Sequence, residues 1–206
     1  RRVRGMSLQQ INSLDRLQNE KKLLKSELPP GFFARPVPKL INGQVSKELN
    51  YFVWICGIPG KAKTLWEGAT LTLYLFFSDK FPAEPPKCQF DPPLPHPNIY
   101  PSGSVCLSLI NATQGWKPQI TIKEILLGIQ LLLNEPNLES PAQQEAFDNL
   151  RNNKKLYDQK IIEFCKKYPS DTFEQRTISM VKLGEFRTTI RGAPAPVHRR
   201  DDVIDV

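Results

Sequence analysis

The sequence has 206 residues, of which 40% are hydrophobic and 24% are charged, and this composition excludes wholesale disorder. The length accommodates one domain with extensions or two very small domains. No apolar run approaches the roughly eighteen residues of a membrane-spanning helix, so we expect no membrane association. Four cysteines without a CxxC pair and two histidines exclude a disulfide scaffold, and we expect no metal and no cofactor.

The net charge of +7 favours acidic partners or nucleic acid, but no nucleic-acid-binding motif accompanies it, so we expect no nucleic acid partner. Because the chain begins with Arg1, we expect a fragment or a processed protein, with Met6 as a candidate start. No signal-peptide pattern is present. Free cysteines without such a signal favour a reducing compartment, and we expect the nucleus and the cytoplasm.

The first predicted element is an amphipathic helix over residues 7–28, in which apolar residues recur every three or four positions. Ser7 is suited to cap this helix, and Pro29 ends it. A basic helix face is either an ordinary solvated surface or a binding surface, and the pattern alone leaves both open. The basic residues on its outer side are Lys21, Lys22 and Lys25.

Four strands are expected next, each marked by alternating or β-branched residues and bounded by turn residues. A loop around the hairpin dipeptide Asn42-Gly43 is expected between the first two. Because no helical pattern separates the strands, they predict an antiparallel meander in an α+β fold. The strands are expected over residues 31–37, 51–58, 71–77 and 87–90.

Helices resume after an irregular segment over residues 92–118, which carries apolar residues of its own and is therefore expected to be functional. Thr121 and Ser140 each begin a capping-box pattern, the second with Pro141 at the first helical position. A last helix is expected over residues 152–168. The domains are therefore a basic extension (1–6), a core (7–168) and a flexible tail (169–206), with a short strand over 178–183.

Cys106 is the candidate nucleophile, because it lies in the irregular proline- and glycine-rich segment where a thiol is accessible. The other three cysteines lie in predicted strands or helices and are expected to be buried. His96 is flanked by prolines, which suits a hydrogen bond to the backbone better than proton transfer. A thiol without a credible base argues against hydrolysis and leaves transfer chemistry open.

His96-Pro97-Asn98, followed after seven residues by Cys106, resembles the signature of the ubiquitin-conjugating enzyme family. Within that family the sequence is most similar to the SUMO-conjugating enzymes, and it keeps their spacing between Cys106 and Trp116. The resemblance covers about residues 7–168 and implies the ubiquitin-conjugating fold. The stretches that carry it are residues 57–68, 96–109, 120–130 and 134–137.

The resemblance implies an enzyme that takes SUMO from the SUMO-activating enzyme and passes it to a substrate lysine, which explains the missing base. Cys106 would hold the thioester, and Tyr100 would flank the incoming lysine. Asn98 would either donate to the oxyanion or brace the loop, and His96 would orient the loop. SUMO ligases and proteins with acceptor lysines are the other expected partners, and the chain is expected to be a monomer.

Substrate contacts are implied for Lys87, Ser140, Pro141, Ala142 and Phe147. Some positions depart from the family pattern, so recognition of the consensus peptide is expected to be weaker or differently tuned. The family often has Asp at 140, Lys at 89, Asp-Lys at 113–114 and Tyr at 147, where this chain has Ser140, Gln89, Thr113, Gln114 and Phe147.

Binding of the activating enzyme and of a second, non-covalent SUMO is implied for Lys21, Lys22 and Lys25. The chain end, residues 201–206, is similar to a SUMO-interacting motif, or it is a chance match in a disordered tail. Two other functions remain open for the whole chain. It is alternatively a ubiquitin-conjugating enzyme with similar loops, or a catalytically idle SUMO-binding relative.

Overall fold

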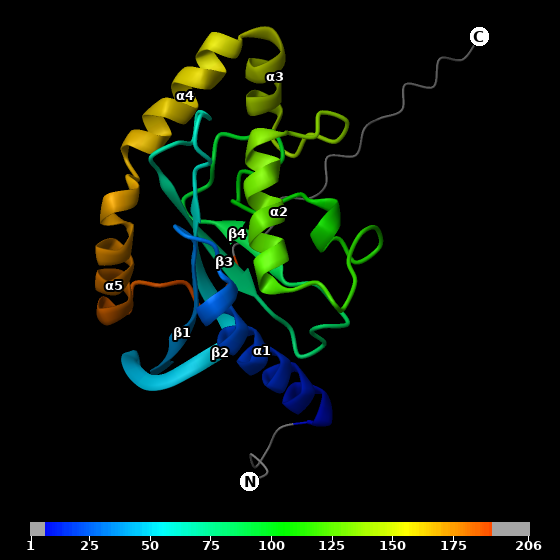
Figure 1. Ribbon diagram of the computed structural model, residues 1–206, viewed down its shortest axis with the longest axis vertical. Coiled ribbons are helices and arrows are strands. Elements are labelled where there is room, and N and C mark those ends of the chain that lie inside the picture. The colour runs from blue at the N-terminus through cyan, green and yellow to red at the C-terminus, as the bar shows by residue number, and fades with distance from the viewer. Residues whose placement is uncertain (1–6, 191–206) are drawn as a thin grey trace, which may run out of the picture.

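A four-stranded antiparallel sheet forms the centre of the computed structural model, which describes residues 7–190 (Figure 1). The strands lie in chain order across the sheet, so the predicted meander is confirmed. They are β1 (Phe33–Ile41), β2 (Gln44–Pro59), β3 (Thr70–Phe76) and β4 (Lys87–Phe90).

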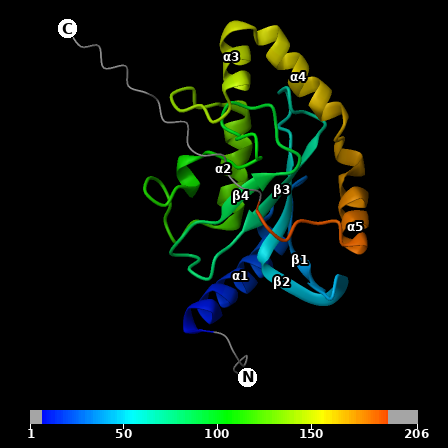
Figure 2. The same cartoon turned by 180° about the vertical axis from the view of Figure 1, so that it is seen from behind.

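Helices cover both faces of the sheet, and the chain has the predicted α+β fold. α1 and α2 lie on the face toward the viewer in Figure 1, and the view from behind in Figure 2 shows the opposite face. The helices are α1 (Leu8–Glu27), α2 (Ile122–Asn134), α3 (Gln144–Asn152), α4 (Lys154–Lys166) and α5 (Phe173–Leu183). Two short 3-10 helices are η1 (Ser108–Ile110) and η2 (Ser170–Thr172).

α1 begins with a capping box at Ser7, as predicted, and two polar side chains on its buried face tie it to the rest of the fold. Ser13 donates a hydrogen bond of 2.6 Å to the carbonyl of Phe81. The Glu20 carboxylate accepts one of 3.0 Å from the N–H of Ile122, the first residue of α2. These bonds satisfy groups that would be costly to bury alone. The buried residues of α1 are Ser13, Leu17, Glu20 and Leu24.

β1 and β2 form one long hairpin, where the sequence predicted two shorter strands and a loop. The turn is made by Asn42 and Gly43, whose φ angles of 52° and 77° suit a two-residue hairpin turn. Ile41 pairs with Gln44 directly across it. The sequence did not predict these strand extensions, because the polar residues on both arms do not alternate regularly with apolar residues.

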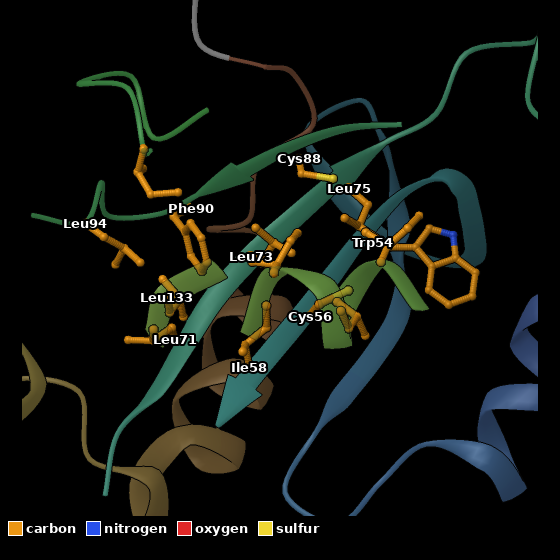
Figure 3. Packing of buried hydrophobic residues seen from close by; sticks show 14 of the residues in the cluster. Trp54, Cys56, Ile58, Leu71, Leu73, Leu75, Cys88, Phe90, Leu94 and Leu133 are labelled. Carbon is orange, nitrogen blue, oxygen red and sulfur yellow. The ribbon is translucent and has the colours of Figure 1, made fainter. Parts of the chain in front are cut away.

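The main core lies between the sheet and α1 and α2 (Figure 3). Side chains from β2, β3 and β4 point into it, with Leu73 opposite Phe90 in the strand register. α2 contributes its buried stripe and begins with the predicted capping box at Thr121. Figure 3 labels Trp54, Cys56, Ile58, Leu71, Leu73, Leu75, Cys88, Phe90, Leu94 and Leu133 in this cluster.

The predicted helix cap at Ser140 is wrong, because α3 begins only at Gln144. The N–H groups of Ala142 and Gln143 both donate to the carbonyl of Pro97, at 2.7 and 3.0 Å. This tertiary contact holds the backbone out of the helix and joins it to the irregular segment. α4 agrees with the predicted last helix, and Asn153 caps it by accepting from the Leu156 N–H.

A fifth helix replaces part of the predicted flexible tail. α5 occupies residues 173–183, so the short strand expected over 178–183 is also wrong. The 1–6 extension and the motif over 201–206 lie outside the described residues. Within residues 7–190, none of the helices has the length and apolar character needed to span a membrane.

Candidate active site

A tight hairpin over residues 98–106 brings together three of the predicted site residues. The Cys106 N–H donates to the Asn98 carbonyl at 2.9 Å, and the Tyr100 N–H donates to the Ser104 carbonyl at 2.9 Å. Between these bonds, Ile99 pairs with Val105. Alternation along the two arms therefore places the side chains of Asn98, Tyr100 and Cys106 on one side of the hairpin.

β4 supports this hairpin along its length. The Val105 N–H donates to the Cys88 carbonyl at 2.9 Å, and the Phe90 N–H donates to the Gly103 carbonyl at 2.8 Å. Gly103 has a φ of 91°, and a Cβ there would lie 2.2 Å from the Phe90 carbonyl oxygen. Only glycine fits this turn, so the hairpin is fixed directly against the sheet.

Cys106 is the one cysteine of the four that is not buried. Burial raises the pKa of the Cys56 and Cys88 thiols, and it raises the pKa of Cys165 to about 11. A protonated, buried thiol is a poor nucleophile. Of the four cysteines, Cys106 is therefore the one whose thiol is accessible.

Tyr100 lies beside the Cys106 sulfur. Partial burial is the main cause that raises the pKa of Tyr100, and the neighbouring Cys106 side chain adds to it. The phenol therefore stays neutral near pH 7. It gives the thiol an aromatic wall on one side.

Asn98 is 1% exposed and uses its side-chain amide to hold the segment after α2. Its Nδ2 donates to the Asn137 carbonyl at 2.7 Å and faces the Ser140 carbonyl at 3.4 Å. Its Oδ1 accepts from the Asn137 N–H at 2.8 Å. The two roles expected for Asn98 are an oxyanion donor and a brace for the loop, and these hydrogen bonds are those of a brace.

His96 is fully buried behind the hairpin. Its Nδ1 accepts a hydrogen bond of 3.1 Å from the Asn98 N–H. Its Nε2 is buried and makes no hydrogen bond within the described part of the chain, although the backbone of Leu132 and Leu133 lies near the ring. Burial lowers the pKa of His96 to about 4, so the ring is neutral near pH 7 and can accept the bond from the Asn98 N–H.

We expect the buried, neutral His96 to make the protein less stable as the pH falls. Histidine in an unfolded chain protonates near pH 6.5, whereas burial lowers the pKa of His96 to about 4. Between these values the unfolded state binds the proton and the folded state does not. The free energy of unfolding should therefore fall by about 2 kcal/mol between roughly pH 7 and pH 5.

Urea unfolding at both pH values measures this difference. Carboxylates with lowered pKa values, such as Glu124, titrate below this window and contribute little to it. An unchanged unfolding midpoint between the two conditions would contradict the assignment of His96 as a neutral buried residue.

The structure joins some of the predicted substrate residues to the hairpin. Lys87 is exposed at the start of β4, whose next residue supports Val105. Ala142 is held by Pro97, as described above, with Ser140 exposed and Pro141 half-buried beside it. Phe147 is half-buried on α3.

Gln89 does not lie on the surface where a substrate-facing lysine would be expected. It is fully buried, and its Nε2 donates to the Ser104 hydroxyl at 3.3 Å. The Ser102 hydroxyl in turn lies 3.0 Å from that of Ser104. Gln89 therefore supports the turn between Tyr100 and Cys106 from below.

The three lysines of α1 differ in their surroundings. Lys22 and Lys25 are exposed, whereas Lys21 is half-buried and its ammonium lies 5.6 Å from the centre of the Tyr51 ring. Such a contact is a cation–π interaction. The side chains of Lys22 and Lys25 are therefore more accessible to a binding partner than that of Lys21.

Asn137 was not singled out by the sequence as a site residue, although it is the main partner of Asn98. The stretch Asn134-Glu135-Pro136-Asn137 is one of those that resemble the family, and it was the sequence signal that could have identified Asn137. Among residues 7–190, no group of three or more histidine, cysteine or acidic side chains is arranged to hold a metal ion.

Comparison with known proteins shows the family to which the chain belongs. Residues 16–165 match the family model described as ubiquitin-conjugating enzyme. The chain is 45% identical over 163 residues to the SUMO-conjugating enzyme UBC9 of Caenorhabditis elegans, covering 79% of this chain and 95% of that protein. It is 48% identical over 154 residues to the SUMO-conjugating enzyme ubc9 of Dictyostelium discoideum, covering 75% and 94%. The chain belongs to the ubiquitin-conjugating enzyme family.

Proposed function

We propose that this protein is a SUMO-conjugating enzyme that carries SUMO as a thioester on Cys106 and passes it to substrate lysines. The observation that carries the proposal is the accessible Cys106 beside Tyr100, on a hairpin fixed by β4 and the brace from Asn98. The name of the relatives, at 45% and 48% identity over nearly their whole length, supports SUMO as the cargo.

The reaction consists of two acyl transfers. In the first, the Cys106 sulfur attacks the C-terminal carbonyl carbon of SUMO, a new C–S bond forms, and the thiol of the activating enzyme leaves. In the second, the neutral amine of a lysine attacks the same carbon. A C–N bond forms, the C–S bond breaks, and the proton lost by the amine goes to the leaving sulfur or to water.

The second step requires an uncharged lysine amine, although a free lysine has a pKa of about 10.4. A site that removes water from the ammonium group favours its neutral form. Tyr100 is partly buried next to Cys106, and we assign this task to its aromatic ring. His96 cannot act as the base, because burial holds its pKa near 4 and its ring faces the core.

Asn98 is proposed as a positioning residue. Its Oδ1 and one Nδ2 hydrogen are engaged with Asn137, and the second hydrogen faces the Ser140 carbonyl at 3.4 Å, so donation to an oxyanion would replace that long contact. The brace fixes residues 137–140 next to the hairpin, to which Ala142 is also held by the Pro97 carbonyl. When a residue acts by positioning, a small displacement of the reacting groups is enough to slow the reaction.

Substrate recognition is proposed to be differently tuned from the family consensus. Lys87 offers one exposed cation at the start of β4, and Gln89 is buried and neutral. Ser140 offers a hydroxyl in place of a carboxylate. The proposed partners are SUMO, its activating enzyme, SUMO ligases and proteins with acceptor lysines, for a monomeric chain in the nucleus and cytoplasm.

We expect Lys22→Glu with Lys25→Glu to slow charging of Cys106 by the activating enzyme at least about fivefold near physiological salt, because both changes reverse an exposed charge on α1. Adding Lys21→Glu tests the full set but also removes the contact with Tyr51. The measurement is the initial charging rate and the affinity for free SUMO.

A matched control reverses Lys155 and Lys166, two exposed lysines on α4. The control should charge at the wild-type rate, and the effect on α1 should shrink as salt is added. Equal behaviour of the two double variants would show that the α1 face has no specific role.

The proposed cargo is tested by incubating the protein and ATP with either the SUMO-activating or the ubiquitin-activating enzyme. A non-reducing gel should show a thiol-sensitive adduct with SUMO and none with ubiquitin. An adduct with ubiquitin alone would make the protein a ubiquitin carrier. No adduct with either would make it a catalytically idle relative.

A further inference from the structure

β4 carries a fully buried glutamine on the side of the sheet that lies away from the main core. Cys88 and Phe90 point into that core, so the residues that alternate with them on β4 point the other way. Lys87 is exposed there, whereas Gln89 is 0% exposed. A side chain without contact to water cannot meet a substrate that arrives from solvent.

Gln89 lies between a strand of the sheet and the hairpin of residues 98–106. On one side, β3 places the fully buried Tyr74 directly opposite Gln89, and Tyr74 packs in a cluster with Phe186. On the other side, Ser104 of the hairpin forms an antiparallel bridge with Gln89. The glutamine therefore joins the sheet to the hairpin that carries Cys106.

The side chain of Gln89 contacts the turn of the hairpin at two points. Its Nε2 donates to the Ser104 hydroxyl at 3.3 Å. A Cβ on Gly103 would lie 3.3 Å from the Gln89 Cγ, so the stem of the glutamine lies directly beneath the turn. Because a buried amide without a partner is costly, the hydrogen bond both satisfies the amide and fixes the serine.

Ser104 in turn fixes the backbone of Tyr100. The Ser104 carbonyl accepts from the Tyr100 N–H at 2.9 Å, and the Gly103 N–H donates to the Tyr100 carbonyl at 2.7 Å. The Ser104 N–H donates to the Ser102 hydroxyl at 3.3 Å, and the two serine hydroxyls are 3.0 Å apart. The N–H and the carbonyl of Tyr100 are thus both held by the turn, and the ring beside Cys106 follows this backbone.

A lysine would not fit the position that Gln89 occupies. Its charged ammonium would have to leave water completely, because the position has no exposed surface. Burial of a charge is far more costly than burial of an amide that has a hydrogen-bond partner. A neutral side chain at position 89 therefore has a task inside the protein, and not that of a cation facing a substrate.

We propose that Gln89 is a positioning residue for the transfer of SUMO to lysine. By holding Ser104 it fixes the turn that places the Tyr100 ring beside the Cys106 thioester, where the incoming lysine loses water. The inference rests on the proposed function. It assigns position 89 to the transfer step and not to recognition of the substrate peptide.

The test measures discharge of the purified SUMO thioester to two acceptors, free lysine and a peptide with one lysine followed by glutamates. Gln89→Leu removes the amide and keeps most of the side-chain volume, and Ser104→Ala removes only the hydroxyl. Each change should slow discharge to both acceptors by the same factor, at least about fivefold, because the displaced turn affects either reaction. The double variant should be no slower than Gln89→Leu, since both changes break the same hydrogen bond.

Free lysine separates positioning from recognition, because it has no peptide chain for position 89 to contact. Slower discharge to the peptide alone would make Gln89 a substrate contact and overturn the proposal. Faster discharge to the peptide in Gln89→Lys would overturn it as well, since that change is expected to slow both acceptors. Gln175→Leu makes the matched change at an exposed position of α5 and should discharge at the wild-type rate.

Hydrogen exchange on the uncharged protein tests the same contact without SUMO. The amides of Tyr100 and Cys106 should exchange at least about fivefold faster in Gln89→Leu and in Ser104→Ala, with β3 unchanged. If Gln89→Leu fails to fold in a thermal melt, Ser104→Ala decides, because it removes a single oxygen atom. Unchanged exchange at both amides would overturn the role of Gln89 alone, whereas a wild-type chain that forms no SUMO thioester would overturn the proposed function.

Discussion

Replacement of Cys106 by serine should leave a protein that accepts SUMO as an oxyester resistant to thiols. The hydroxyl occupies the place of the only cysteine that is not buried, but an alkoxide leaves far less readily than a thiolate. Transfer to lysine should fall at least about a hundredfold. The measurement is a gel with and without reductant, followed by discharge of the isolated adduct to a lysine acceptor.

A matched control is Cys165→Ser, since that thiol is 8% exposed and its pKa is raised to about 11. The control should form the ordinary thiol-sensitive adduct. If Cys106→Ser also forms a fully thiol-sensitive adduct, another cysteine is the acceptor and the site is misassigned.

Asn98→Ala should leave charging of Cys106 nearly intact and slow lysine transfer at least about tenfold. The reason is the loss of the two strong bonds between the Asn98 side chain and the backbone of Asn137, at 2.7 and 2.8 Å. Residues 137–140 should then move relative to the hairpin. Single-turnover rates of charging and discharge measure the two steps separately.

Hydrogen exchange at the Asn137 amide separates the brace from an oxyanion role. The brace predicts faster exchange there in the alanine variant, together with slower transfer. Slower transfer with unchanged exchange would instead favour an oxyanion donor. Equal loss in charging and transfer would mean that Asn98 acts through folding alone.

The sheet was predictable from local pattern, and its extensions were not. β3 alternates Leu71, Leu73 and Leu75, and this period of two identifies a strand facing a core. Tyr74, on the opposite side, is fully buried as well, because Phe186 and Val181 from the C-terminal part of the chain belong to the cluster around it. Burial of a strand residue by a segment that is distant in the sequence cannot be predicted from the residue pattern of the strand itself.

α5 was missed because Pro169 and the later prolines and charges were read as a tail. Its own signals were present in the sequence. Phe173, Thr177 and Val181 recur every four residues, and Gly184 ends the helix with a φ of 73°.

The site residues were predictable from a motif, whereas their roles required the fold. Asn98 and Asn137 are 39 positions apart, and no local rule joins them. The failed cap at Ser140 has the same cause, since the distant Pro97 carbonyl accepts from the Ala142 and Gln143 N–H groups, to which a capping side chain would otherwise bond. The role of Gln89 likewise follows from its hydrogen bond to Ser104, and the two residues come together only in the folded chain.

The most direct measurement is discharge of the purified SUMO thioester after the activating enzyme has been quenched. A protein with an acceptor lysine is added, and intact mass spectrometry follows the thioester and its products. The proposed function predicts that the thioester on Cys106 is consumed faster as acceptor is added, with an isopeptide-linked product in equal amount. Loss of the thioester to free SUMO at one rate, with or without acceptor, would contradict it.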